Sequence, residues 1–203
     1  MAMEIITVES NILGSNTYIL KNKNSALIID AGATLQQLQP HLNDVKVEGV
    51  LLTHLHFDHV YELDSYVNEF GCSVYLFDEA NVGNQRYTLP KLIGGVKLPQ
   101  NCYKSLKDVS VLKLNNFKVE CFHTPGHTAD SMCFKINNNL FSGDTLFFGT
   151  VGRTDLPTSS PQQMLNSLNL LNGLEFKTCY SGHGQPSSFE EQKENIKYFL
   201  LEL

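Results

Sequence analysis

Short apolar segments rich in β-branched and aromatic residues recur along the chain, and each is closed by polar residues or glycine. This pattern is typical of β-strands, because such side chains suit a half-buried pleated surface. Residues 137–139 separate two segments too tightly for a crossover helix, which predicts an antiparallel hairpin. The predicted strands are residues 18–20, 26–29, 50–52, 74–77, 109–114, 117–122, 132–136, 140–141 and 178–180.

Helical periodicity lies between these strands. Four segments repeat apolar residues at spacings of three and four, so each should bury one face. Three of them open on a capping residue, which is Thr34 in the first, Ser160 followed by Pro161 in the second, and Ser187 or Ser188 in the last. The remaining segment carries Leu63, Tyr66, Val67 and Phe70 on one side.

The alternation of strands and helices predicts an α/β protein with a mixed sheet, or two, covered by helices. The chain has 203 residues, of which 42% are hydrophobic and 18% charged. That composition suits one domain, residues 1–203, with one sizeable core. The long stretch without clear periodicity, residues 84–107, is expected to be a surface excursion or a lid.

Charge and cysteine content narrow the function classes. The formal net charge is -6, and the basic residues are scattered, so nucleic acid is not an expected partner. The N-terminus lacks an export signal and no segment approaches 18 uninterrupted apolar residues, so we expect a cytoplasmic protein without membrane contact. An odd number of cysteines without a CxxC pair predicts reduced, buried thiols at Cys72, Cys102, Cys121, Cys133 and Cys179.

Potential metal ligands are concentrated directly after the predicted strand at 50–52. The sequence there, THLHFDH at 53–59, holds three imidazoles and one carboxylate. A loop that leaves a strand can direct alternate side chains toward one point, and this spacing differs from the helical HExxH zinc motif. Neutral imidazole and carboxylate are the ligands that zinc, iron and manganese accept, so four donors here could serve two ions.

Three further donors follow other predicted strands. His127 stands in TPGHT, Asp144 in SGDT and His183 in SGHG, each beside glycine that suits a tight turn near a ligand. We expect all these donors to converge at one edge of the sheets. By contrast, His41 and His123 are interpreted as surface or hydrogen-bonded structural residues.

The series HLHFDH, TPGHT, SGDTLF, GRTD and SGHG, in this order, is similar to the metallo-β-lactamase superfamily from about residue 12 to residue 190. GRTDLP at 152–157 and the absence of a large insertion resemble the small glyoxalase-II-like hydrolases. The resemblance implies a four-layer αββα sandwich of two mixed β-sheets flanked by helices, with the site between sheet edges.

The resemblance also implies a ligand assignment for two divalent metal ions, with zinc expected and iron or manganese as alternatives. One ion would take His54, His56 and His127, the other Asp58, His59 and His183, and Asp144 would bridge them. Two departures from the family pattern stand out: Val60, Tyr61 and Glu62 occupy positions where small residues or glycine are usual, and Asp130 stands where glycine is common. These departures bear on substrate access rather than on metal binding.

A two-metal site of this kind favours hydrolysis by a metal-bridging hydroxide, with one ion polarising the substrate carbonyl. Asp58 is the predicted catalytic residue, orienting the hydroxide while it binds its ion. A thiolate leaving group, with a pKa of about 8.5, needs little acid assistance. We therefore expect a glyoxalase II-like thioesterase acting on hydroxyacyl thioesters of a small thiol, although the short sequence after His183 argues against tight glutathione binding.

Other readings stay open. A mono-iron persulfide dioxygenase resembles the same fold and would use His54, His127 and Asp144; metal content and oxygen consumption would distinguish it. A scaffold that only binds a partner would be insensitive to chelation. A secreted β-lactamase should begin with an export signal, and an RNA-processing nuclease should offer a basic surface. Arg153 and Asp155 form either a structural ion pair or a direct substrate contact.

Overall fold

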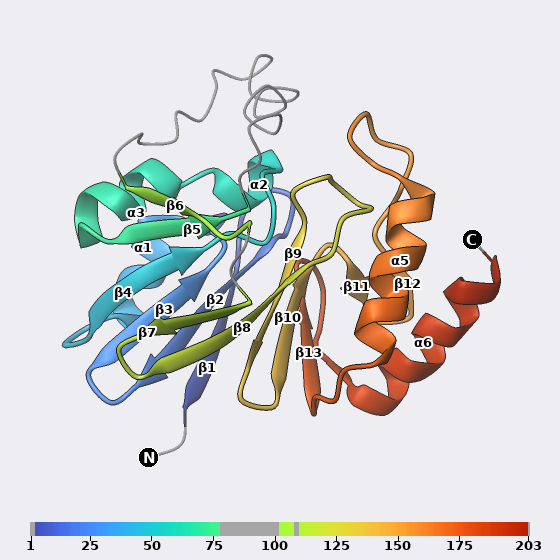
Figure 1. Cartoon of the computed structure of the whole chain (residues 1–203). Coiled ribbons are helices and arrows are strands. Elements are labelled where there is room, and N and C mark those ends of the chain that lie inside the picture. Colours follow the sequence, from blue (N-terminus) through green and yellow to red (C-terminus); the bar gives the residue numbers. More distant parts are fainter. Residues whose placement is uncertain (1–2, 78–101, 108–109, 203) are drawn as a thin grey trace.

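Two six-stranded mixed β-sheets form the centre of the molecule (Figure 1). The structure is a computed structural model, and it describes residues 3–77, 102–107 and 110–202. The first sheet has the order β1 (Glu4–Glu9), β2 (Asn16–Asn22), β3 (Ser25–Ile29), β4 (Lys46–Leu51), β5 (Ser73–Leu76) and β6 (Tyr103–Ser105). The second has the order β14 (Ser187–Ser188), β13 (Thr178–Ser181), β10 (Asn139–Gly143), β9 (Met132–Ile136), β8 (Phe117–His123) and β7 (Val111–Leu114).

Strand direction brings several carboxyl ends to one edge. In the first sheet β1, β2 and β3 are antiparallel, whereas β3, β4, β5 and β6 run parallel. In the second sheet only β10 and β13 are parallel neighbours. A separate short hairpin, β11 (Leu146–Phe147) with β12 (Thr150–Val151), follows β10.

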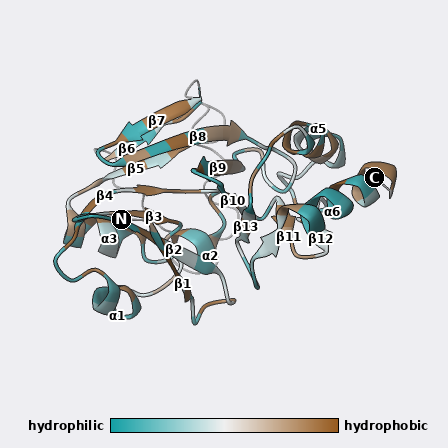
Figure 2. Cartoon of the chain, turned by 90° about the horizontal axis from the view of Figure 1, so that it is seen from below, coloured by the Kyte–Doolittle hydropathy of each residue, from teal (hydrophilic) through white to brown (hydrophobic). Residues whose placement is uncertain are grey.

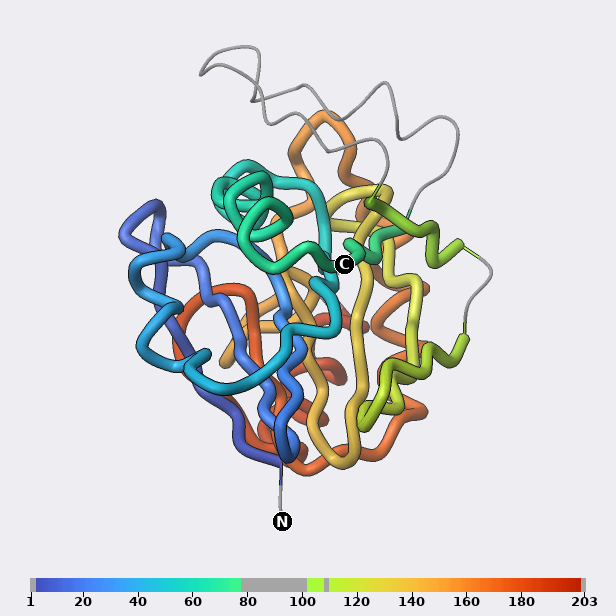
Figure 3. The backbone as a smooth tube through the Cα atoms, turned by 90° about the vertical axis from the view of Figure 1, so that its left-hand side faces the viewer, coloured from blue at the N-terminus to red at the C-terminus, as the bar shows by residue number. Residues whose placement is uncertain are grey.

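Helices cover the outer face of each sheet, so the layers run helix, sheet, sheet, helix (Figures 1 and 3). The first sheet is covered by α1 (Leu35–Leu38), the 3-10 turn η1 (Gln39–His41) and α3 (Leu63–Phe70), whereas α2 (Phe57–Val60) lies at its edge. The second is covered by α5 (Pro161–Asn172) and α6 (Phe189–Glu202). The expected four-layer αββα sandwich is confirmed.

Three apolar clusters hold these layers together. One lies between the first sheet and its helices, a second between the two sheets, and a third between the second sheet and α5 with α6. The middle cluster contains the stacked rings of Phe141 and Tyr180, with Tyr18 edge-on to both. On β7 and β8, apolar segments, brown in Figure 2, lie next to polar ones, as expected where a strand has one buried face.

The predicted helix starts are confirmed by their hydrogen bonds. The Thr34 hydroxyl accepts from the Gln37 amide, and the Gln37 side chain accepts from the Thr34 amide. At α5 the Ser160 hydroxyl accepts from the Gln163 amide at 3.3 Å. Of the two candidates for the last helix, Ser188 makes the reciprocal contacts, with Glu191. Each cap satisfies amides that have no partner inside the helix.

Some elements differ from the sequence expectations. The segment carrying Asp58 and His59 was interpreted as a loop, and this is wrong, because both residues lie on the helical turn α2. Adjacent helical residues point about 100° apart, which still lets both side chains reach one centre. Strand β1 was missed, because its mainly exposed or half-buried residues show no clean alternation and its order comes from pairing with β2.

Two other expectations concern the cysteines and the aperiodic stretch. All five thiols are free; Cys102 is half-buried and the other four are buried. Burial raises the pKa of Cys179 to about 12 and that of Cys133 to about 11, so these thiols stay protonated.

Residues 84–101 and Val109 lie outside the described residues, and β6 occupies the end of the aperiodic stretch. No helix in the described ranges could cross a membrane.

Candidate metal centre

The structure brings the seven predicted donors together where strands of both sheets end. His54 and His56 follow β4, and Asp58 and His59 lie on the next turn, α2. The other three follow strands of the second sheet, and these are His127 after β8, Asp144 after β10 and His183 after β13. The site therefore lies between the edges of the two sheets.

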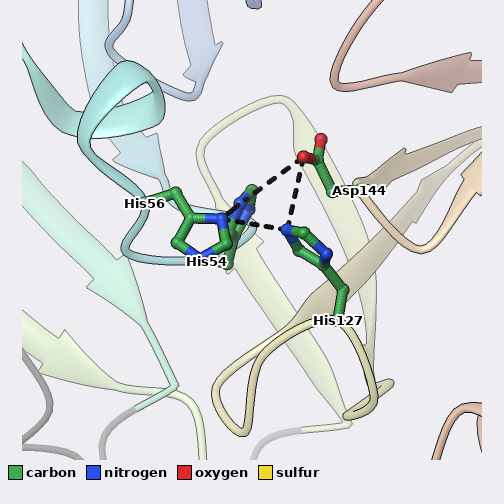
Figure 4. A group of neighbouring side chains, drawn as sticks. All are labelled: His54, His56, His127 and Asp144. Carbon is green, nitrogen blue, oxygen red and sulfur yellow. Dashed lines mark hydrogen bonds and ion pairs between the residues drawn. The ribbon is translucent and has the colours of Figure 1, made fainter. Parts of the chain in front are cut away.

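The donors form two groups in which all potential ligand atoms lie within 4.8 Å of one another. His54, His56, His127 and Asp144 make the first cluster (Figure 4). In it, His56 Nδ1 lies 3.0 Å from His54 Nε2 and 2.9 Å from His127 Nε2, and Asp144 Oδ2 lies 3.4 Å from His127 Nε2. Three imidazoles thus direct ring nitrogens at one point.

The second cluster contains Asp58, His59 and His183. His183 Nε2 lies 3.1 Å from Asp58 Oδ2, and His59 Nε2 lies 3.6 Å from the same oxygen. Asp144 faces this cluster too, because its Oδ1 lies 3.4 Å from His59 Nε2 while its Oδ2 faces the first cluster. One carboxylate therefore stands between the two groups, as a bridging ligand would.

Residues present at the site fit divalent metal ions. Asp144 Oδ1 is buried and has no hydrogen-bond partner among the described residues. His59 Nε2, 3.4 Å away, is close enough for an ion pair but does not form a hydrogen bond with it. A buried carboxylate oxygen left without a hydrogen bond is costly unless a cation neutralises it. Imidazole and carboxylate are also the donor types that zinc, iron and manganese accept.

A surrounding set of hydrogen bonds orients four of the imidazoles. Each of these uses Nδ1 for a contact with a neighbouring oxygen, which directs Nε2 toward the cluster. His56 is the exception and directs Nδ1 inward. The contacts join His54 to Thr53 Oγ1 (3.1 Å), His59 to Asp30 Oδ2 (2.8 Å), His127 to the Arg153 carbonyl (3.0 Å) and His183 to the Gly14 carbonyl (3.2 Å).

Asp30 is a functional residue that the sequence analysis missed. Its Oδ1 accepts from the Thr53 amide and its Oδ2 from the Thr53 hydroxyl, both at 2.7 Å, in addition to the contact with His59. The side chain is buried and the backbone is left-handed, with φ 61°. Its place directly after β3, with Gly32 two residues on, is the strand-end signal that marked the other donors.

Glycines allow backbone to approach the clusters closely. A Cβ on Gly182 would lie 2.1 Å from Asp144 Oδ1 and 2.8 Å from His59 Cε1. A Cβ on Gly152 would lie 1.8 Å from the Asp144 carbonyl oxygen. Such contacts are shorter than atoms tolerate, so only glycine fits at these two positions.

Protonation states in the first cluster match those of metal ligands. Burial, reinforced by neighbouring imidazoles, lowers the pKa of His54 well below its usual range, and burial lowers that of His56 to about 4. Burial by itself raises the pKa of Asp144, but His59, His127 and His183 together lower it to about 2. At neutral pH these groups are neutral imidazoles and an ionised carboxylate, the forms that bind cations.

The second cluster holds a proton in the metal-free protein. Burial alone lowers the pKa of His59, yet the carboxylates of Asp144 and Asp30 raise it well above its usual range. The hydrogen bond to Asp58 raises the pKa of His183. A cation at this cluster would take the place of protons and interact with the same carboxylates.

The remaining singled-out residues are not members of the two donor clusters. His123 contacts the Ala129 carbonyl and stacks on Phe77, which agrees with a structural role. Tyr61 is 42% exposed and packs edge-on against Phe57. Asp130 is buried. Arg153 and Asp155 form an exposed ion pair.

The comparison with protein families agrees with this geometry. The sequence profile of the metallo-β-lactamase superfamily matches residues 11–183, which is most of the chain. The chain belongs to this superfamily. The resemblance drawn from the sequence motifs is thereby confirmed.

Relatives within the superfamily are similar over nearly their full length. A probable metallo-hydrolase of Methanocaldococcus jannaschii is 33% identical over 186 residues, which cover 84% of this chain and 88% of that protein. The hydroxyacylglutathione hydrolase GloC of Haemophilus influenzae is 29% identical over 209 residues, which cover 96% of each chain. Both of these relatives are named as hydrolases.

Solved structures give the same result. The BLEG-1 B3 metallo-β-lactamase superposes with a TM-score of 0.81 at 27% identity, covering 97% of this chain and 99% of its own. TTHA1623, solved in a di-iron-bound form, superposes with a TM-score of 0.79 at 27% identity, covering 94% and 98%. Fold, family and donor set together indicate a divalent-metal site in a metallo-hydrolase fold.

Proposed function

We propose that this protein is a binuclear metal-dependent thioester hydrolase, similar to glyoxalase II. The observation that carries the proposal is the pair of donor clusters with the Asp144 carboxylate between them. A single ion would leave one cluster of buried imidazoles and carboxylates without its cation. Two ions would use all seven donors.

The assignment of ligands follows from the two clusters. His54, His56 and His127 would hold one ion, Asp58, His59 and His183 the other, and Asp144 both. We propose zinc for both ions, with iron or manganese as alternatives. Two bound divalent ions would supply a Lewis acid and a water molecule activated near neutral pH.

Asp58 is the proposed catalytic residue. Burial opposes its ionisation, but the hydrogen bond from His183 lowers its pKa, so the carboxylate is charged at neutral pH. An ionised carboxylate accepts hydrogen bonds only, and it can therefore orient the attacking water by one of that water's protons. Asp30 and Thr53 keep His59 and His54 in place during this step.

A small-molecule thioester is the proposed substrate, with neither nucleic acid nor membrane as a partner and a cytoplasmic location. The similarity to a hydroxyacylglutathione hydrolase over 96% of both chains supports this substrate class. The chemistry agrees, because a thiolate leaves without protonation by a strong general acid. Persulfide oxidation by one iron at His54, His127 and Asp144 is the competing activity, and the second cluster disfavours it.

Thiol release tests the proposal. Zinc-loaded protein purified without a histidine tag is mixed with lactoyl thioesters of glutathione and of N-acetylcysteamine, and the free thiol is measured. We expect turnover that His54→Ala abolishes together with metal content, whereas His123→Ala retains both. Oxygen uptake by iron-loaded protein with a persulfide, in the absence of thioester turnover by either metal form, would show the competing activity instead.

A further inference from the structure

The loop that follows β12 carries an arginine whose backbone belongs to the metal centre. The carbonyl of Arg153 accepts a hydrogen bond from His127 Nδ1 at 3.0 Å. The preceding residue, Gly152, packs so closely against Asp144 and His127 that it has no room for a Cβ. The position of the Arg153 Cα beside the first cluster is therefore fixed.

Neighbouring contacts hold the rest of this loop beside His127. The Ser159 hydroxyl donates to the His127 carbonyl at 2.6 Å, and the Ser160 amide donates to the Gly126 carbonyl at 2.8 Å. In Figure 1 the loop between β12 and α5 rises at the same edge as the loop after β8. The backbone of Arg153 is thus held beside the metal-ligand candidate His127.

The side chain of Arg153 is exposed but oriented. Its Nε donates to Asp155 Oδ1 at 2.7 Å and its Nη2 to Asp155 Oδ2 at 2.8 Å, while the two side chains are 62% and 69% exposed. Exposed ion pairs of this kind typically add less than about 1 kcal/mol to stability. A guanidinium has five N–H donors, so three remain for another acceptor.

The free donors suit an anionic group on the substrate. A planar guanidinium binds carboxylates through paired N–H groups, and a partner that fixes its plane reduces the entropy lost on binding. Arg153 is the only arginine among residues 3–77, 102–107 and 110–202. Its place beside His127 puts that charge within side-chain reach of a substrate bound at the first cluster.

We propose that Arg153 determines specificity by binding a carboxylate of the substrate, with Asp155 as the residue that positions its guanidinium. This inference rests on the proposed function, and it narrows the substrate to thioesters that carry an anionic group in addition to the reacting carbonyl. The ion pair is then part of substrate recognition.

Matched substrates test this. The succinyl and butyryl thioesters of N-acetylcysteamine have the same thiol and the same chain length, but only the first bears a carboxylate. We expect wild-type zinc-loaded protein to prefer the succinyl thioester and Arg153→Ala to lower the ratio of the two kcat/KM values about tenfold, mainly through KM. Asp155→Asn should lower the ratio by a smaller factor, again through KM, and Arg153→Lys should restore only part of it.

Lys46→Ala is the control, because it removes an exposed cation from another ion pair, with the mostly buried Glu48, at the start of β4. A ratio that is the same in Arg153→Ala and Lys46→Ala, or a wild type without preference, overturns the inference. Calorimetric titration of the zinc-loaded proteins with succinate and butyrate decides the matter if no thioester is hydrolysed. Selective succinate binding that Arg153→Ala removes supports the inference even where the proposed function has failed, and equal binding of both acids contradicts it.

Discussion

At the scale of single residues, Asp30 holds two of the candidate metal ligands in place, although it belongs to none of the sequence motifs that contain them. Its carboxylate contacts His59 of the second cluster directly and holds His54 of the first cluster through the Thr53 hydroxyl. It does so from a left-handed backbone position, which costs an ordinary side chain roughly 1 kcal/mol or more. The hydrogen bonds that Asp30 accepts offset this strain.

Asp30→Asn should weaken metal binding without unfolding the protein. An amide keeps the size of the carboxylate but loses its charge and one acceptor oxygen, so His59 is held less firmly and is less basic. Loss of such an outer contact typically reduces metal affinity by about 10-fold to 100-fold. Competition with a zinc chelator measures this, with Glu48→Gln as the control. Equal zinc affinity in the two variants would contradict the role given to Asp30.

Gly182→Ala should displace the metal centre. The added methyl group would stand 2.1 Å from Asp144 Oδ1, and the backbone after β13 must move to relieve the contact. We expect loss of bound metal and a lower Tm. Gly173→Ala is the matched control, because its φ is −80° and the nearest atom to the new Cβ would lie 3.5 Å away. Normal metal content in Gly182→Ala would show that the close approach is not needed.

At the scale of elements, α5 supports the loop that carries His127. The Ser160 amide donates to the Gly126 carbonyl, and the Ser167 hydroxyl donates to the Pro125 carbonyl at 2.6 Å. Gly126 also packs against the Met164 backbone, where a Cβ would lie 2.5 Å from the Met164 Cα. The helix thus fixes a ligand that it does not itself contain.

Removing the cap of α5 should lower stability. Ser160→Ala leaves the Gln163 amide without its acceptor, and the expected cost is about 1 kcal/mol in the free energy of unfolding. Chemical denaturation of the metal-depleted protein measures it, and Ser160→Asp should restore most of the loss. If Ser160→Ala were as stable as wild type, the hydrogen bond would contribute nothing to α5.

Prediction from sequence succeeded where a local rule was sufficient. Strand β3 contains a continuous apolar run, β9 is apolar except for Lys135, and the caps of α1 and α5 show the expected residue pairs. Strand β1 and the short hairpin β11–β12 owe their order to pairing with neighbours, which no local pattern encodes. Asp30 carries the strand-end signal that marked the other donors, but its contact with Thr53 depends on the parallel pairing of β3 with β4, which no local pattern encodes.

At the scale of the whole molecule, the clusters join the two sheets. Four donors come from the segment after β4 in the first sheet, whereas His127, Asp144 and His183 come from the second. Protein contacts also cross this boundary, since the Asn16 amide donates to the Gly182 carbonyl at 2.7 Å. Bound metal would therefore add a cross-link between layers that already meet through the apolar cluster and through such hydrogen bonds.

Metal removal should lower the Tm of the wild-type protein. A ligand that binds only the folded state stabilises it by an amount that grows with its concentration over Kd, about 2.7 kcal/mol at 100 times Kd. Scanning calorimetry with and without a chelator measures the difference, which should disappear in Asp144→Asn. If chelation did not change the Tm of the wild-type protein, bound metal would not stabilise the sandwich, and the prediction would be wrong.

The number of metal ions per chain tests the central claim most directly. Plasma mass spectrometry on untagged protein that has never met a chelator gives both identity and stoichiometry. Two ions per chain, of zinc, iron or manganese, are the predicted result, with the loss of both in Asp144→Ala. A single iron per chain, or no metal after reconstitution, would contradict the binuclear hydrolase.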